Sequence, residues 1–231
     1  MKLKNISKKK LIIPVIIIII AILLIAYIIP SVFNNKNQNP DDIIKNSINN
    51  LQQTQALSFT TKSQLNVNGD SKEYGNITGE ILQNNDLHIK GAILGSEIEL
   101  YKINNCIYRF DNITQNWQKT TENPDVYNNA LFNETDPLAQ FNFKEYTNQE
   151  IIESDSKNLY CVRFSPALSE DSLSQYFTDI VYTIYCDNQF NMTKAVINGK
   201  LTNNSVTGEL NIVTEFSILP EDYSIEPPIV E

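Results

Sequence analysis

The sequence has little of what enzymes and metalloproteins need at their sites. It contains one histidine in 231 residues, His88, and only seven glycines, which do not cluster. A Ser-His-Asp or Cys-His arrangement would have to use His88, which stands in an alternating segment with no motif around a nucleophile and is expected on the surface of a strand. The scattered glycines exclude glycine-rich phosphate-binding loops. We therefore expect no enzyme, no cofactor and no metal site.

Cysteine is also scarce. The three residues, Cys106, Cys161 and Cys186, have spacings that fit neither a Cys-x-x-Cys redox motif nor a zinc site. Three cysteines allow one pair and one left over. A disulfide between Cys161 and Cys186 is one interpretation, and buried free thiols that pack as small apolar side chains are the other.

Basic residues are rare outside the N-terminal end. Five of the 18 lysines and arginines precede residue 11, where there is no Asp or Glu, so the net charge of −9 becomes −14 for the rest of the chain. Nucleic-acid binding needs clustered lysine and arginine, and the rest of the chain has no such cluster. We expect no nucleic-acid partner and an acidic, solvated surface that keeps the protein soluble.

One long apolar run, Leu11 to Pro30 (LIIPVIIIIIAILLIAYIIP), carries no charge. A helix of about 20 residues matches the roughly 30 Å hydrocarbon core of a bilayer. The preceding lysines predict a cytoplasmic tail over residues 1–10, and hence a single-pass plasma-membrane protein whose later residues are extracytoplasmic. A cleaved signal peptide is the alternative, but the run exceeds about 15 residues and lacks an A-x-A-like site. We favour an uncleaved anchor over residues 11–30, followed by a tether over residues 31–39.

The next segment, residues 40–219, predicts one domain that starts with a helix and a meander. Pro40, the carboxylates of Asp41 and Asp42, and apolar residues at helical spacing predict an amphipathic helix to about Gln55. Apolar and polar residues then alternate in short runs joined by Asn- and Gly-containing turns, which indicates antiparallel strands with one covered face and one wet face. The predicted strands are 58–67, 74–82, 87–93, 97–103 and 106–110.

The second half of the domain is less regular. Thr120 to Phe143 loses the alternation and is expected to lie across the open side of the sheet, where it can act as a lid. Leu173, Tyr176, Phe177 and Ile180 stand at helical spacing and predict a second amphipathic helix. Further strands are predicted up to residue 152 and over 159–164, 182–186, 192–201 and 206–217, followed by an extended tail over 220–231.

This order of elements resembles the lipoprotein localisation factor superfamily, which includes LolA and the LppX-like and LprG-like lipid carriers. The resemblance rests on three short stretches within about residues 41–217. They are Leu57-Ser58-Phe59-Thr60 at the first helix-to-strand junction, Ile98-Glu99-Leu100-Tyr101 through Ile107-Tyr108 with Trp117 after the next turn, and Tyr185-Cys186-Asp187-Asn188. It implies an α+β domain in which a curved antiparallel sheet, an incompletely closed β-barrel, holds helices on its concave side around an apolar cavity.

Members of this superfamily use such a cavity for acyl chains, so the resemblance implies an anchored binding module of the bacterial cell envelope for an acyl chain, lipid or lipoprotein. The candidate ligand-binding residues are Phe59, Leu65, Ile89, Ile98, Leu100, Tyr108 and Phe110. Plain core packing is the alternative for each of them. A structural or sensory envelope module without a ligand, acting through a membrane protein partner, is the alternative function.

Overall fold

The computed structural model describes residues 38–104, 106–121, 136–153, 159–168, 173–203 and 206–230. Pro40–Glu231 form one compact unit. The predicted cytoplasmic tail and membrane anchor lie outside the described residues. Among the residues that are described, no helix is long and apolar enough to cross a membrane.

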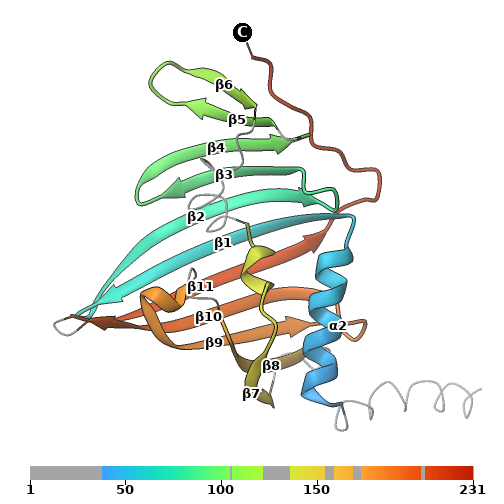
Figure 1. Ribbon diagram of the computed structural model, residues 1–231, viewed down its shortest axis with the longest axis vertical. Coiled ribbons are helices and arrows are strands. Elements are labelled where there is room, and N and C mark those ends of the chain that lie inside the picture. Colours follow the sequence, from blue (N-terminus) through green and yellow to red (C-terminus); the bar gives the residue numbers. More distant parts are fainter. Residues whose placement is uncertain are drawn as a thin grey trace, which may run out of the picture. The chain divides into compact units, whose positions relative to one another are not determined.

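The first described element, helix α2 (Pro40–Gln53), confirms the predicted amphipathic helix. Pro40 begins it, where a missing backbone N–H costs nothing, and two carboxylates follow in its first turn. Its buried residues, Ile43, Ile44, Ser47 and Leu51, repeat at helical spacing and face strands β7, β8 and β10. The helix therefore covers one part of the sheet, as Figure 1 shows.

Within the described residues, eleven strands form a single antiparallel sheet that is not closed. Their bounds are β1 (Ala56–Val67), β2 (Asp70–Leu82), β3 (Leu87–Ile93), β4 (Ser96–Ile103), β5 (Cys106–Asp111), β6 (Asn116–Thr121), β7 (Tyr146–Ile151), β8 (Tyr160–Pro166), β9 (Phe177–Cys186), β10 (Met192–Asn203) and β11 (Val206–Ile218). The order across the sheet is β6-β5-β4-β3-β2-β1-β11-β10-β9-β8-β7, so β6 and β7 are the edges. Two meanders thus meet in the middle, where β1 pairs with β11. Figure 1 shows the strands curving around α2 and the short helix η2 (Ala139–Phe141).

The concave face, which α2 and η2 cover, carries the main core. Cross-strand partners share a face, and the register aligns Phe59, Gly79, Ile89 and Leu100 in one row across β1 to β4. These apolar side chains belong to the same buried cluster as the helix residues Ile43, Ile44 and Leu51, and as residues of β8 to β11. The core is therefore continuous across both meanders.

A smaller cluster lies on the opposite, convex face. Ile103 and Tyr108 are buried there against Ile225 of the C-terminal tail, with Tyr101 and Trp117 packed beside them. The tail, residues 220–230, contains neither helix nor strand, as the sequence predicts, and Figure 1 shows it (red) running past the ends of β2 to β5. It therefore covers part of the sheet rather than standing free of it.

Two sequence predictions differ from the structure. The predicted second amphipathic helix is wrong: only a single 3-10 turn, η3 (Leu173–Gln175), is helical there, and Phe177 and Ile180 belong to β9. The run from Phe177 to Cys186 is rich in β-branched and aromatic residues, which favour a strand. The sequence pattern predicts no strand over residues 116–121 and the loss of alternation from Thr120, whereas these residues form the edge strand β6, which is mostly polar on both faces.

Candidate functional site

The ligand site expected from the sequence would lie between the concave face and the segments that cover it. One of those segments is residues 136–143, which we call the strap; it is the described part of the predicted lid. Phe141 of the strap is 2% exposed, and its ring meets Tyr182 edge to face at 6.0 Å between centroids and Phe216 at 6.4 Å. Phe143 lies 5.6 Å from Phe164 and 5.7 Å from Tyr182. The strap thus fills the concave side with aromatic rings.

Polar contacts at the strap are few. The Tyr182 hydroxyl donates to the backbone oxygen of Gln140 at 3.1 Å, and burial raises the pKa of Tyr182, so that this hydroxyl remains a donor. At the start of the strap, Asp136 accepts a hydrogen bond from the backbone N–H of Leu138 at 2.8 Å. Burial raises the pKa of Asp136, although that hydrogen bond and the nearby Lys102 lower it. The strap is therefore held on the strands beneath it by the rings of Phe141 and Phe143, by Leu138, which also packs against the core, and by the hydrogen bond from Tyr182.

The structure divides the seven candidate residues between the two faces of the sheet. Phe59, Ile89 and Leu100 are buried in the concave core, and Leu65 and Ile98 pack against it. Tyr108 lies in the convex cluster, opposite Tyr101 across the β4–β5 hairpin. Phe110 is two residues further along β5 and contacts the Trp117 ring at 5.2 Å. The structure thus brings five of the seven together and separates Tyr108 and Phe110 from them.

Side chains fill the concave core closely. Ile89 has no exposed surface, and Phe59 and Leu100 are each 3% exposed. Cys186 is buried beneath α2, and burial raises the pKa of its thiol to about 11. These residues act as core in this structure, so an apolar ligand has to displace part of the covering elements to reach them.

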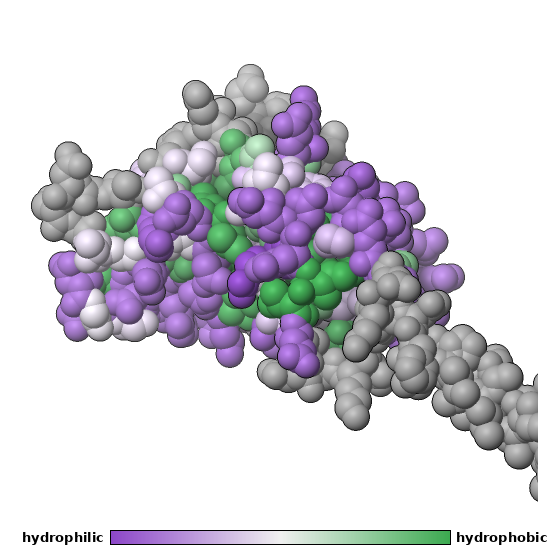
Figure 2. Space-filling view, turned by 90° about the horizontal axis from the view of Figure 1, so that it is seen from below, coloured by the Kyte–Doolittle hydropathy of each residue, from purple (hydrophilic) through white to green (hydrophobic). Residues whose placement is uncertain are grey.

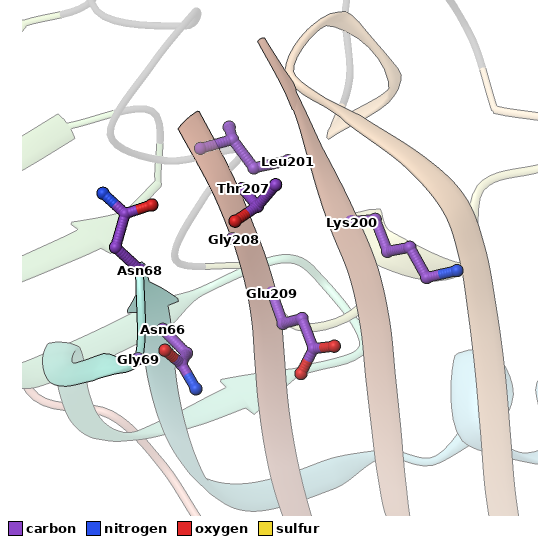
Figure 3. Close-up of a pocket in the computed structure, with 8 residues that line it drawn as sticks. All are labelled: Asn66, Asn68, Gly69, Lys200, Leu201, Thr207, Gly208 and Glu209. Carbon is purple, nitrogen blue, oxygen red and sulfur yellow. The ribbon is translucent and has the colours of Figure 1, made fainter. Parts of the chain in front are cut away.

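A pocket of about 360 Å³ lies elsewhere, at the ends of the two central hairpins. It is lined by Asn66, Asn68, Gly69, Lys200, Leu201, Thr207, Gly208 and Glu209 (Figure 3). Lys200 in its wall pairs with Asp179 at 3.0 Å. Leu201 is the one large apolar side chain among these lining residues, so the pocket does not suit an acyl chain.

The structure does not join Cys161 and Cys186 in a disulfide, which was one of the two interpretations of the sequence. Strands β8 and β9 are neighbours, but Cys161 is paired with Tyr185, and Cys186 with Tyr160. Since cross-strand partners share a face, the two cysteines point to opposite sides of the sheet. Both side chains are buried among apolar residues, which agrees with the second interpretation, thiols that pack as small apolar side chains.

His88 stands on β3, on the convex face, as expected for a strand histidine. Its ring nitrogens contact Glu80 and Glu99. Within the described part of the chain, no group of three or more histidine, cysteine or acidic residues is placed to hold a metal ion. The contacts of His88 are therefore with carboxylates and with an aromatic ring, Tyr101.

The sequence matches no protein-family model and no curated protein. Solved structures with a similar fold do exist. The neighbours include a LolA superfamily protein. That protein, from Nitrosomonas europaea, is 8% identical, and the likeness covers 78% of this chain and 92% of that one with a TM-score of 0.32.

LprF from Mycobacterium bovis is 10% identical over 83% of this chain and 97% of its own, with a TM-score of 0.47. A DUF1329 family protein from Desulfovibrio piger is 8% identical over 82% and 96%, with a TM-score of 0.34. The structural neighbours thus include a LolA superfamily protein and LprF, both at low identity.

Proposed function

We propose that the domain is an extracytoplasmic binding module for an apolar ligand, such as an acyl chain, a lipid or a lipoprotein, which residues 11–30 hold at the plasma membrane. The observation that carries this proposal is the cover of the concave face. Two separate elements, α2 and the strap, close the apolar side of an open sheet, and the strap contacts the core through Leu138, Phe141 and Phe143. An apolar ligand can take the place of these rings without disturbing the strands.

The energies favour such an exchange. Exposing two phenylalanine side chains costs roughly 3–6 kcal/mol, whereas burying about 14 methylenes of an acyl chain gains roughly 11 kcal/mol. The side-chain hydrogen bond from Tyr182 to Gln140 adds only about 1 kcal/mol to the stability of the form in which the strap covers the concave face. Figure 2 shows apolar side chains reaching the surface between hydrophilic residues on the side seen from below, which supports access of a ligand to the interior.

Native mass spectrometry of the full chain, purified from its own membranes in detergent, tests the proposal. We expect a bound species whose mass corresponds to a lipid or an acylated peptide. The double variant Phe141→Ala, Phe143→Ala should retain more of it, because the competing rings are gone. Ile113→Ala is the matched control, since Ile113 is 93% exposed in the β5–β6 turn. A folded wild-type protein and a folded double variant that both carry no ligand would contradict the proposal.

A structural or sensory module without a ligand is the second candidate. The close packing of Phe59, Ile89 and Leu100, each 3% exposed or less, favours it, because a core that is already full needs no ligand. This function would act through a membrane protein partner. Crosslinking in cells that recovers one specific partner, together with the absence of bound lipid, would distinguish it from the first.

A further inference from the structure

His88 lies between two carboxylates on the convex face. Its Nδ1 is 2.7 Å from Oε2 of Glu80 on β2, and its Nε2 is 3.4 Å from Oε1 of Glu99 on β4. The three side chains are only 20–27% exposed. A neutral imidazole donates from one ring nitrogen and presents a lone pair at the other, whereas the imidazolium donates from both. The charged form of His88 therefore satisfies both carboxylates, and the neutral form leaves one of them facing a lone pair.

The imidazole ring is also the first member of a row of stacked rings. It lies parallel to Tyr101 at 4.1 Å between centroids, and Tyr101 meets Trp117 edge to face at 5.3 Å. Tyr101 and Trp117 both pack against the convex cluster that contains Ile225 of the tail. A continuous series of contacts thus joins His88 to the residue that anchors the tail.

The tail meets this cluster with negative charge. Ile225 is 9% exposed and fixes the tail on the cluster, while Glu221, Asp222 and Glu226 flank it in the sequence. Burial and then the charge of Glu80 raise the pKa of Tyr223. Burial and then the charges of Glu99 and Glu80 likewise raise the pKa of Tyr101. The acidic tail is therefore docked on the convex cluster, against which Tyr101 packs while its ring stacks on His88.

We propose that His88 is a pH-sensitive switch that holds the C-terminal tail, residues 220–230, against the convex face when it is protonated and loosens it when it is neutral. The charged groups around it are Glu80 on β2, Glu99 on β4 and Lys90 on β3, whose ammonium lies 3.3 Å from Glu99. With these groups the site has a net charge of zero when His88 is protonated and of −1 when it is neutral. A negative site repels an acidic tail, so the tail docks more strongly on the imidazolium form than on the neutral imidazole form.

The chain provides its own probe, because Trp117 is the only tryptophan and His88 the only histidine. We would follow Trp117 fluorescence of the full chain in detergent micelles from pH 5 to 8.5. The wild type should show one step. His88→Gln, which is always neutral, should have no step and resemble the wild type at high pH, whereas His88→Arg, which is always charged, should resemble it at low pH.

Tail docking can be measured separately by chymotryptic cleavage after Tyr223, which is 37% exposed. Dividing each rate by the His88→Arg rate at the same pH removes the pH dependence of the protease. The wild-type ratio should be about fivefold higher at pH 8 than at pH 6, as expected for a partly exposed ion pair. An equal ratio at both pH values would overturn the proposal.

Ile225→Ala is the control for the tail itself. If the fluorescence step keeps its full size in this variant, protonation of His88 affects only the stacked rings and does not control docking of the tail. Should His88→Gln fail to fold by circular dichroism, Glu99→Gln replaces it and should shrink the step. Because lipid retention plays no part in these measurements, failure of the switch and failure of the proposed ligand binding are distinguishable.

Discussion

Phe59 lies over Gly79, directly across the β1–β2 pair. A Cβ atom at Gly79 would come within 2.7 Å of the Phe59 ring and would also collide with the backbone oxygen of His88 on the next strand. The absence of a side chain at Gly79 therefore lets an aromatic ring lie flat on the concave face in the row that continues to Ile89 and Leu100.

Gly79→Ala should therefore destabilise the domain by about 3 kcal/mol, the upper range for overpacking a well-filled core. Urea unfolding of the full chain in detergent, followed by circular dichroism, measures this. Gly95→Ala is the control: its Cβ meets open space, so only the positive φ of 76° opposes it, at a cost of about 1 kcal/mol. Equal losses for the two variants would show that the contact with Phe59 is unimportant.

The hydroxyls of Thr61 and Thr214 hydrogen-bond at 3.0 Å across the central β1–β11 pair, and the two residues are only 6% and 2% exposed. Thr61→Val removes one partner and leaves a buried hydroxyl without it, so we expect a loss of about 1–3 kcal/mol. The double variant Thr61→Val, Thr214→Val should be more stable than either single variant. A double-mutant cycle from urea unfolding gives the coupling, and strictly additive losses would contradict it.

The three cysteines should differ in reactivity. Cys106 is half-buried, whereas Cys161 and Cys186 are 1% and 0% exposed. At pH 8, a thiol reagent should modify Cys106 first and the other two only after unfolding. Cys106→Ser should remove the fast phase. A mild oxidant should not link Cys161 to Cys186 in the folded protein, since they face opposite sides of the sheet; recovery of that disulfide by peptide mapping would contradict the register.

Alkaline pH should destabilise the domain through Cys186. Burial raises the pKa of this thiol from 9.0 to about 11, so the unfolded chain releases the proton at a lower pH than the folded one. The contribution of Cys186 to the free energy of unfolding is therefore constant below about pH 9. It falls by at most about 3 kcal/mol as the pH rises from about 9 to 11. Unfolding curves across this range measure the loss, and Cys186→Ala should flatten the dependence. An unchanged slope in that variant would assign the effect to other groups.

Local patterns predict much of the first meander. The strand 87–93 matches β3 at both ends, because alternating side chains and Asn- or Gly-containing turns mark its limits. The faces of β5 could also have been derived by counting across the two-residue turn at 104–105. Ile103 pairs with Cys106. Tyr108 therefore lies on the same face as Tyr101, and Arg109 lies on the same face as Leu100. Tyr108 and Leu100 therefore lie on opposite faces of the sheet, and the prediction that placed them in one site did not take this register into account.

The remaining differences come from tertiary context. Tyr176, Phe177 and Ile180 fit a helical spacing, but β10 on one side and β8 on the other supply strand partners for most of the segment Phe177–Cys186. Pairing with two neighbours outweighs a weak helical pattern. No local signal identifies the strap as the cover of Tyr182, or the tail as the partner of Tyr108, because both contacts join residues far apart in the chain.

The pairing of β1 with β11 has a consequence for how the protein is made. The strand nearest the start of the domain completes its hydrogen bonds with the last described strand, in the middle of the sheet. During synthesis each meander can collapse as it emerges, but the seam between them stays open until residue 218 has left the ribosome or the secretion channel. A chain that ends before residue 206 keeps ten strands but lacks β11, which joins the two meanders. We therefore expect proteases to degrade such fragments soon after they form.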